Sequence, residues 1–206
     1  MVDLGYLGIF AAVAITVIAL LLMIRNAINK RESEVSGVVA QHLKQKAEKE
    51  AKKEALRKSI KIIKWDDRFV VDGGLIDRDH KALFKLVNAF NKNVPDFESL
   101  SQMAPFLKSL SKYMLAHFKR EEKLQEVSGF IFSDEHQQEH KEMIEKFQVM
   151  LNKANKANRH NITDIAVEIG EFLQEWLTDH VIENDLQMRP FVDRMKEHSE
   201  TMAELN

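Results

Sequence analysis

The sequence predicts an all-α protein, in which one transmembrane helix and a charged helical neck precede an up-down four-helix bundle. The 206 residues include only three prolines and seven glycines, and this composition favours helix. A 21-residue run without charge lies near the amino terminus, and a charged stretch follows it. After residue 62 come four amphipathic segments with short links, which is the pattern of an up-down bundle.

The uncharged run is Leu4–Ile24, which as a helix is long enough to cross a hydrocarbon core of about 30 Å. A cleaved signal peptide is the alternative, but it would have a basic amino-terminal region and a shorter apolar core. Here Asp3 precedes the run, whereas Arg25, Lys30 and Arg31 follow it. We therefore expect residues 1–25 to be an uncleaved, single-pass anchor that contacts lipid through residues 4–24. The positive-inside rule then places the following domain in the cytoplasm, at the cell inner membrane.

Residues 26–61 form a charged linker, or neck, that is rich in helix formers with interleaved lysine and glutamate. Val35, Val39 and Leu43 begin a thin apolar seam on it. This seam is compatible with a loose coiled coil, but a solvated helical spacer is the favoured interpretation. Residues 1–61 hold 11 Lys/Arg and 6 Asp/Glu, whereas residues 62–206 hold 19 and 26. An acidic head argues against nucleic-acid binding by residues 62–206.

The head, residues 62–206, should begin with an irregular arm over Ile62–Leu75. The Gly73-Gly74 pair breaks a helix, and the apolar residues Trp65, Phe69 and Val71 suit an arm that packs over the domain. The four bundle helices are expected over about Asp77–Asn93, Phe97–Glu126, Ser133–Asn155, and Asn161 or Thr163 to Met188.

Three residues refine the expected helix boundaries. Pro105 predicts a kink or a restart early in the second helix. Ser133 suits the amino-terminal cap of the third helix, and Pro190 should open a short terminal helix. The inner side of the first helix is expected to carry Ile76, Leu83, Phe84, Val87 and Phe90.

Each of the four predicted helices carries side chains that can bind metal. His136 and His140 lie four residues apart and so share one helix face, as do His117 and Glu121. Because the chain has no cysteine, imidazole and carboxylate must hold any metal, and these ligands suit iron, zinc, copper or manganese. Seven donors of this mix suit two metal ions that share bridging carboxylates. They are His80, His117, Glu121, His136, His140, His180 and Asp185.

One spacing in this set does not fit a regular helix. At 100° per residue, His180 and Asp185 project about 140° apart. Both reach one site only if Asp185 approaches from the side or if a local π-turn closes the angle. A lone buried histidine such as His80 is more often a hydrogen-bonded core residue than a ligand. However, several unpaired polar groups inside one bundle would each cost about 1–3 kcal/mol, and a bound metal removes that cost. His42, His160 and His198 have no partner donors and are expected at the surface.

These residues, in this order, resemble the hemerythrin family, particularly the bacterial hemerythrins. The matching motifs are Ile76-Asp77-x-x-His80-Lys81-x-Leu83-Phe84, His117-Phe118-x-x-Glu121-Glu122, His136-x-x-Glu139-His140 and Trp176-Leu177-x-x-His180-x-x-x-x-Asp185. With Trp65 and Gly74 in the arm, the resemblance covers residues 62–191. Three features depart from the family pattern: Asp79 before the first ligand, Asp72 before Gly73, and Gly129-Phe-Ile-Phe before the third helix.

The resemblance implies a hemerythrin-like bundle with a non-haem di-iron centre that has an oxo or hydroxo bridge. His136, His140 and His180 would hold one iron, His80 and His117 the other, and Glu121 and Asp185 would bridge them. The implied function is reversible binding of dioxygen without enzymatic turnover. The predicted anchor would tether this O₂ carrier or reservoir beside a membrane enzyme that consumes O₂.

Other functions stay open at this point. The same site would serve a sensor of O₂ or NO that signals through the neck to a partner, or a di-iron peroxidase, oxidase or nitric oxide reductase. A purely structural membrane adaptor would leave the seven donors unexplained.

Overall fold

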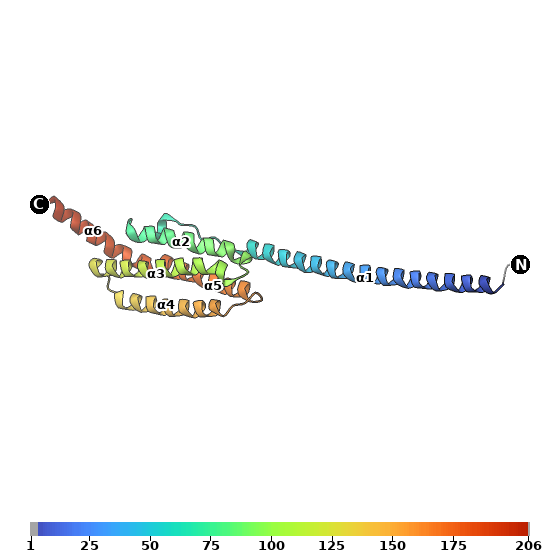
Figure 1. The fold of residues 1–206 in the computed structure, drawn as a ribbon. Helices are drawn as coiled ribbons and strands as arrows, with labels where there is room; N and C mark the ends of the chain where they lie inside the picture. The colour runs from blue at the N-terminus through green and yellow to red at the C-terminus, as the bar shows by residue number, and fades with distance from the viewer. Residues whose placement is uncertain (1–3, 206) are drawn as a thin grey trace. The chain divides into compact units, whose positions relative to one another are not determined.

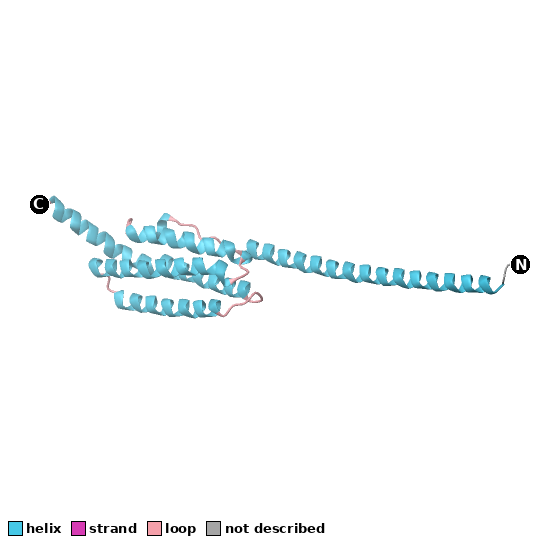
Figure 2. Ribbon diagram, in the orientation of Figure 1, coloured by secondary structure: helices cyan, strands magenta, loops and turns pink. Residues whose placement is uncertain are grey.

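The protein is described from a computed structural model that covers residues 4–205, with side chains from residue 15 onward. Helices and loops account for all of this range, and no strand occurs within it (Figure 2). The chain divides into two compact units, residues 1–54 and residues 55–206. The all-helical prediction is therefore confirmed for the described residues.

One long helix, α1, runs over Leu4–Ser59 and includes nearly all of the predicted neck (Figure 1). The apolar seam residues Val35, Val39 and Leu43 are exposed, and so is His42. Among the described residues, no helix combines the length and the apolar character needed to cross a membrane. The predicted span Leu4–Ile24 begins in residues 4–14, whose side chains lie outside the described set. The anchor therefore stays a prediction.

Four helices of the second unit form the bundle: α2 (Leu75–Asn93), α3 (Leu100–Ser128), α4 (Ser133–Asn155) and α5 (Ile162–Trp176). Each packs against the helix before or after it in sequence, and α5 also packs against α2, which closes the ring (Figure 1). Short 3₁₀ turns, η1 (Asp67–Phe69) and η2 (Val94–Asp96), flank α2. This is the predicted up-down arrangement.

The bundle helices enclose a main apolar core, and a smaller apolar cluster that includes Ile76 lies beside the carboxyl-terminal helix α6 (Arg189–Glu204). All five residues expected on the inner side of α2 are buried, and they are Ile76, Leu83, Phe84, Val87 and Phe90. Their successive intervals of seven, one, three and three residues place them on one stripe of the helix, and burial of such a stripe drives helix packing. Pro105 lies inside the continuous helix α3, so no restart occurs there.

The arm before α2 packs against the bundle as predicted. Trp65 and Phe69 both lie beside Phe84, with ring centroids 5.7 and 6.2 Å away. The Asn88 side chain accepts a hydrogen bond from the Ile63 N–H and donates one to the Ile63 carbonyl. These contacts lay the arm along α2, and Trp65 also lies near His80, with ring centroids 6.5 Å apart.

Two expected helix boundaries are wrong. Ser133 does not cap α4, because the helix already includes it and Phe132 occupies the cap without a side-chain hydrogen bond. The fourth helix does not continue as a regular α-helix to Met188. It ends at Trp176 and passes into a π-helical segment, η3 (Leu177–Asn184), and a 3₁₀ turn, η4 (Asp185–Met188). Helix α6 (Arg189–Glu204) follows, with Pro190 in its first turn as predicted.

Candidate metal centre

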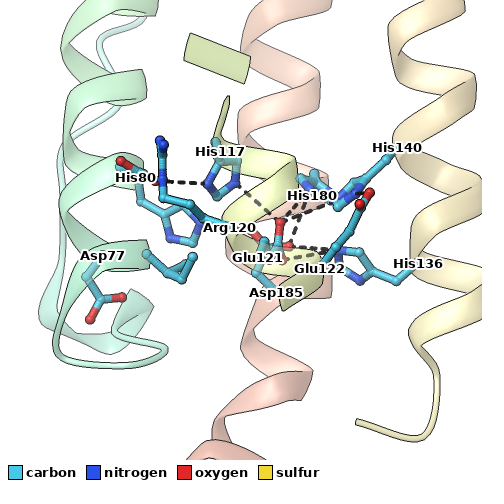
Figure 3. A network of polar contacts seen from close by, with 12 residues as sticks. Asp77, His80, His117, Arg120, Glu121, Glu122, His136, His140, His180 and Asp185 are labelled. Atoms are coloured by element: carbon cyan, nitrogen blue, oxygen red, sulfur yellow. Dashed lines mark hydrogen bonds and ion pairs between the residues drawn. The ribbon is translucent and has the colours of Figure 1, made fainter. Parts of the chain in front are cut away.

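All seven predicted ligands come together in the interior of the bundle (Figure 3). The donors come from four sides: α2 supplies one, α3 two, α4 two, and the segment after α5 the last two. Every one is buried, with exposed fractions between 0% and 4%. Side chains that lie far apart in the sequence therefore form one enclosed polar cluster, made of His80, His117, Glu121, His136, His140, His180 and Asp185.

Glu121 lies at the centre of this cluster. Its carboxylate oxygens are 3.2 Å from His136 Nε2, 3.3 Å from His140 Nε2 and 3.7 Å from His180 Nε2. On the other side, Glu121 Oε2 is 3.4 Å from His117 Nε2. One carboxylate thus contacts imidazoles of both predicted halves of the site, as a bridging ligand must.

Asp185, the first residue of η4, makes equivalent contacts from another side of the cluster. Its Oδ2 atom is 3.0 Å from His80 Nε2, and its Oδ1 atom is 3.3 Å from His136 Nε2 and 3.4 Å from His180 Nε2. Asp185 therefore also contacts imidazoles of both halves. The two carboxylates together connect all five histidines.

The π-helical segment explains how His180 and Asp185 reach the same site. The Asp185 N–H donates to the His180 carbonyl, which is the i to i+5 hydrogen bond of a π-helix. The wider turn of a π-helix reduces the 140° offset expected on a regular helix. Of the two geometries that the spacing allowed, the structure has the π-turn.

The donor atoms have almost no other partners, which is the main evidence that the residues fit a metal. Among the described residues, buried side-chain atoms without a hydrogen-bond partner include both carboxylate oxygens of Glu121 and of Asp185 and both ring nitrogens of His80 and His117. Two overlapping groups of donors each lie within 4.8 Å of one another: Glu121, His136, His140 and His180, and His117, Glu121, His180 and Asp185. Buried polar groups are normally satisfied. This cluster could hold a metal.

The electrostatics of the cluster favour anionic carboxylates. Burial opposes ionisation of Glu121, but its contacts with three histidines hold its pKa well below the usual range. Burial lowers the pKa of His136, yet Asp185 and Glu121 together raise it to about 10. Burial dominates at His117, whose pKa is lowered. The carboxylates are therefore in the form that binds metal, and protons compete for His136.

Comparison with known proteins assigns the family. A family model described as "Hemerythrin HHE cation binding domain" matches residues 74–202, which is more than half of the chain. This chain belongs to the hemerythrin family. The match includes all seven residues of the cluster, and it begins one residue before α2 and ends inside α6.

Several individual proteins resemble the hemerythrin domain of this chain. A hemerythrin-like protein of Naegleria gruberi is 26% identical over 125 residues, covering 61% of this chain and 89% of that protein. A myohemerythrin of Riftia pachyptila is 29% identical over 117 residues, covering 57% and 82%. A bacteriohemerythrin of Pseudomonas aeruginosa is 25% identical over 121 residues, covering 59% and 75%. A crystal structure of a hemerythrin mutant has a TM-score of 0.54 and 22% identity, covers 65% of this chain and 98% of its own, and supports the fold.

A second layer of side chains orients the histidines of this hemerythrin domain. Glu122 Oε1 lies 3.0 Å from His140 Nδ1, so that ring is held from both sides. Phe118 stacks on the same ring, with centroids 3.9 Å apart. Sequence reasoning missed the role of Glu122, which could equally be an exposed neighbour of Glu121. The sequence feature that pointed to Glu122 was its position directly after the ligand Glu121.

Asp79 makes the corresponding contact in the other half. It is buried, accepts a hydrogen bond from Arg120 Nε at 2.5 Å, and lies 3.8 Å from His117 Nδ1. Burial raises the pKa of Asp79, but His117 and Arg120 outweigh this effect and lower it. An acid at this position therefore keeps its charge inside the hemerythrin fold because Arg120 pairs with it.

Asp72, a second of the three departures from the family pattern, stabilises the start of α2. Its carboxylate accepts hydrogen bonds from the backbone N–H groups of Gly74, Ile76 and Asp77. In return, Asp77 accepts from the N–H groups of Val71 and Gly73. These reciprocal bonds satisfy the free donors of the helix end, like a capping box. His80 stands one turn further along this fixed helix end.

Proposed function

We propose that this hemerythrin domain binds dioxygen reversibly at a non-haem di-iron centre. The observation that carries the proposal is the contact of both Glu121 and Asp185 with imidazoles from both halves of the site. His136, His140 and His180 would hold one iron, and His80 and His117 the other. Bound iron would supply the electrons that O₂ binding requires and recover them on release. The relatives named bacteriohemerythrin and myohemerythrin support this assignment.

The side chains of this chain set the conditions for reversible binding. Five imidazoles and two carboxylates leave less negative charge than a carboxylate-rich site would. Apolar residues of the core, including Phe118 and Trp176, surround the cluster and exclude water. Glu122 keeps the His140 ring oriented through its outer nitrogen. The Asp79 carboxylate lies 3.8 Å from the outer nitrogen of His117 and places a negative charge beside that ring. Leu115, although next to this stretch of α3, is 42% exposed and takes no part.

The test uses the full chain, purified in a non-ionic detergent and loaded with ferrous iron. About two irons per chain, and a visible absorption band that appears in air and disappears under argon over repeated cycles, are the expected results. The variant Glu121→Ala should lack this absorption band, whereas the variant His160→Ala, at an exposed site, should show it unchanged. Irreversible oxidation by air would refute the carrier function and favour a sensor or an oxidase-type enzyme.

We further propose that residues 4–24 tether this domain to the inner membrane, with the head in the cytoplasm, beside an enzyme that consumes O₂. The support is the charge-free run followed by Arg25, Lys30 and Arg31. The full chain should stay in the membrane fraction after alkaline carbonate extraction, and a chain lacking residues 1–25 should not. Protease added to sealed inside-out vesicles should remove the head. Release of the intact chain by carbonate would contradict the tether.

The delivery role has its own test. Cells with the full chain should keep a higher rate of O₂-dependent respiration at low O₂ than cells with the chain lacking residues 1–25. Equal rates at equal protein levels would refute delivery, while leaving O₂ binding itself intact.

A further inference from the structure

A cavity of about 500 Å³ lies in the second unit, apart from the metal centre. Its walls are the last turn of α1 and the start of the arm, the carboxyl-terminal end of α2, and the outer side of α5 with the start of η3. None of the seven predicted metal ligands lines it. The volume falls in the range of small-molecule sites. The hemerythrin assignment gives this cavity no role.

One wall of the cavity is a ridge of three acidic side chains. Glu171, Glu175 and Asp179 follow one another at intervals of four residues, and all three are exposed. Among the residues that the structure describes, no cation pairs with any of them. Like charges at this spacing destabilise a helix. Lys61 is the only basic residue on the cavity wall, so the wall keeps a net negative charge.

The second feature is a buried acceptor without a donor. Asn91 lines the cavity, is only 5% exposed, and its Oδ1 atom has no hydrogen-bond partner among the described residues. This oxygen lies over Gly170, which also lines the cavity, and a Cβ at Gly170 would be 2.5 Å from it. The missing side chain of Gly170 thus leaves room for a polar atom in the cavity wall. An unpaired buried acceptor is unfavourable, because it has lost its hydrogen bonds to water.

The remaining walls are apolar and come from Leu56, Ile60, Val94 and Val167. The cavity therefore combines an apolar surface with acceptors that need N–H donors and positive charge. A single divalent ion does not fit, because none of the three acidic residues belongs to a donor group close enough to share one metal. An anion would be repelled by the ridge.

We propose that this cavity binds an organic cation: a protonated amine with a compact apolar body. The ammonium group lies against Glu171 and Glu175, and the apolar body lies against Leu56 and Val167. Asn91 Oδ1 is enclosed against Gly170, so it accepts from the ammonium group after the Asn91 amide turns about its last torsion angle. This site is independent of the iron centre.

The test is isothermal titration calorimetry of the iron-loaded full chain in a non-ionic detergent, with benzylamine as the probe. Benzyl alcohol and benzoate are the neutral and anionic comparisons. We expect saturable binding of benzylamine alone, weakened by added salt. The variant Glu171→Gln/Glu175→Gln should bind about fivefold more weakly, the scale for two exposed charge contacts. The matched variant Glu135→Gln/Glu145→Gln, with exposed acids outside the cavity, should bind normally.

Asn91→Leu separates the buried acceptor from the charges, and it should also weaken binding, while the iron content stays unchanged. Equal affinity for benzyl alcohol would overturn the proposed ligand class. Unchanged binding by Glu171→Gln/Glu175→Gln, or no saturable binding at millimolar benzylamine, would overturn the site. If the wild-type protein binds benzylamine but does not bind O₂ reversibly, the proposed function of the metal centre is refuted and the proposed amine site is not.

Discussion

Removal of iron from the full chain should lower the melting temperature of the helical bundle by about 15 °C. Six of the seven predicted ligands have buried side-chain nitrogen or oxygen atoms without a hydrogen-bond partner. At about 1 kcal/mol for each residue, the low end for an unsatisfied buried group, the loss is about 6 kcal/mol. The low end applies because imidazole–carboxylate contacts of 3.0–3.7 Å remain without metal. At about 2–4 °C per kcal/mol for a domain of this size, the shift is about 12–24 °C.

The assay is differential scanning calorimetry of the detergent-solubilised chain, first with iron and then after removal with a chelator. The variant Glu121→Ala/Asp185→Ala provides the control, because it removes two buried acids and should make the melting temperature insensitive to the chelator. A chelated wild-type protein that melts within about 3 °C of the loaded form would refute the reasoning. That result would mean that the buried donors are satisfied by one another or by water.

Three further predictions concern residues around the centre. Asp72→Ala should destabilise the head by about 1 kcal/mol at pH 7, as expected for loss of a cap. Burial opposes ionisation of Asp72, but backbone N–H donors outweigh it and lower the pKa. Its contribution is therefore present above the ordinary carboxyl pKa and is lost as the pH falls through the folded value, which urea titrations at pH 7 and pH 3 would measure. Gly170→Ala should cost about 1–3 kcal/mol in the same titration, because the new Cβ meets Asn91 Oδ1 at 2.5 Å. Glu122→Gln should weaken iron binding about tenfold in a chelator competition, because His140 loses an anionic partner.

Each of these predictions has a result that contradicts it. An Asp72→Ala penalty that is as large at pH 3 as at pH 7 would exclude a charge-dependent cap. If Asn91→Ala does not recover part of the stability lost in Gly170→Ala, the clash is not the cause. If the exposed-site variant Glu135→Gln weakens iron binding as much as Glu122→Gln, general electrostatics, and not the contact with His140, explains the effect.

Much of the fold could be predicted because its signals are local. The apolar stripe of α2 and the Pro190 start of α6 follow from spacing and backbone chemistry within a few residues. The prediction of helix ends was less accurate. Ser133 carries a good capping side chain, yet the chain enters α4 one residue earlier at Phe132, since Gly129 in the left-handed conformation already ends α3.

The ligands of the candidate site could be chosen from the sequence because each helix offered few alternatives. The spacing of His180 and Asp185 even limited the geometry to a side approach or a π-turn. The outer contacts could not be predicted in the same way. Whether Glu122 or Asp79 faces a ligand depends on the rotation of neighbouring helices, and the pairing of Arg120 with Asp79 joins residues 41 positions apart. Such contacts follow from packing and not from local pattern.

The π-helical segment also restricts how the length of this chain can vary. Insertions and deletions are usually tolerated in loops and at exposed termini. Here, a deletion between His180 and Asp185 would turn everything after it by about 100°. Arg189 and Lys196, which donate to the backbone carbonyls of Val70 and Asp72, would then point away from the arm. The segment is thus held from one side by the cluster and from the other by α6. Homologous chains should therefore vary in length at the turns between helices while the count from Trp176 to Lys196 stays fixed.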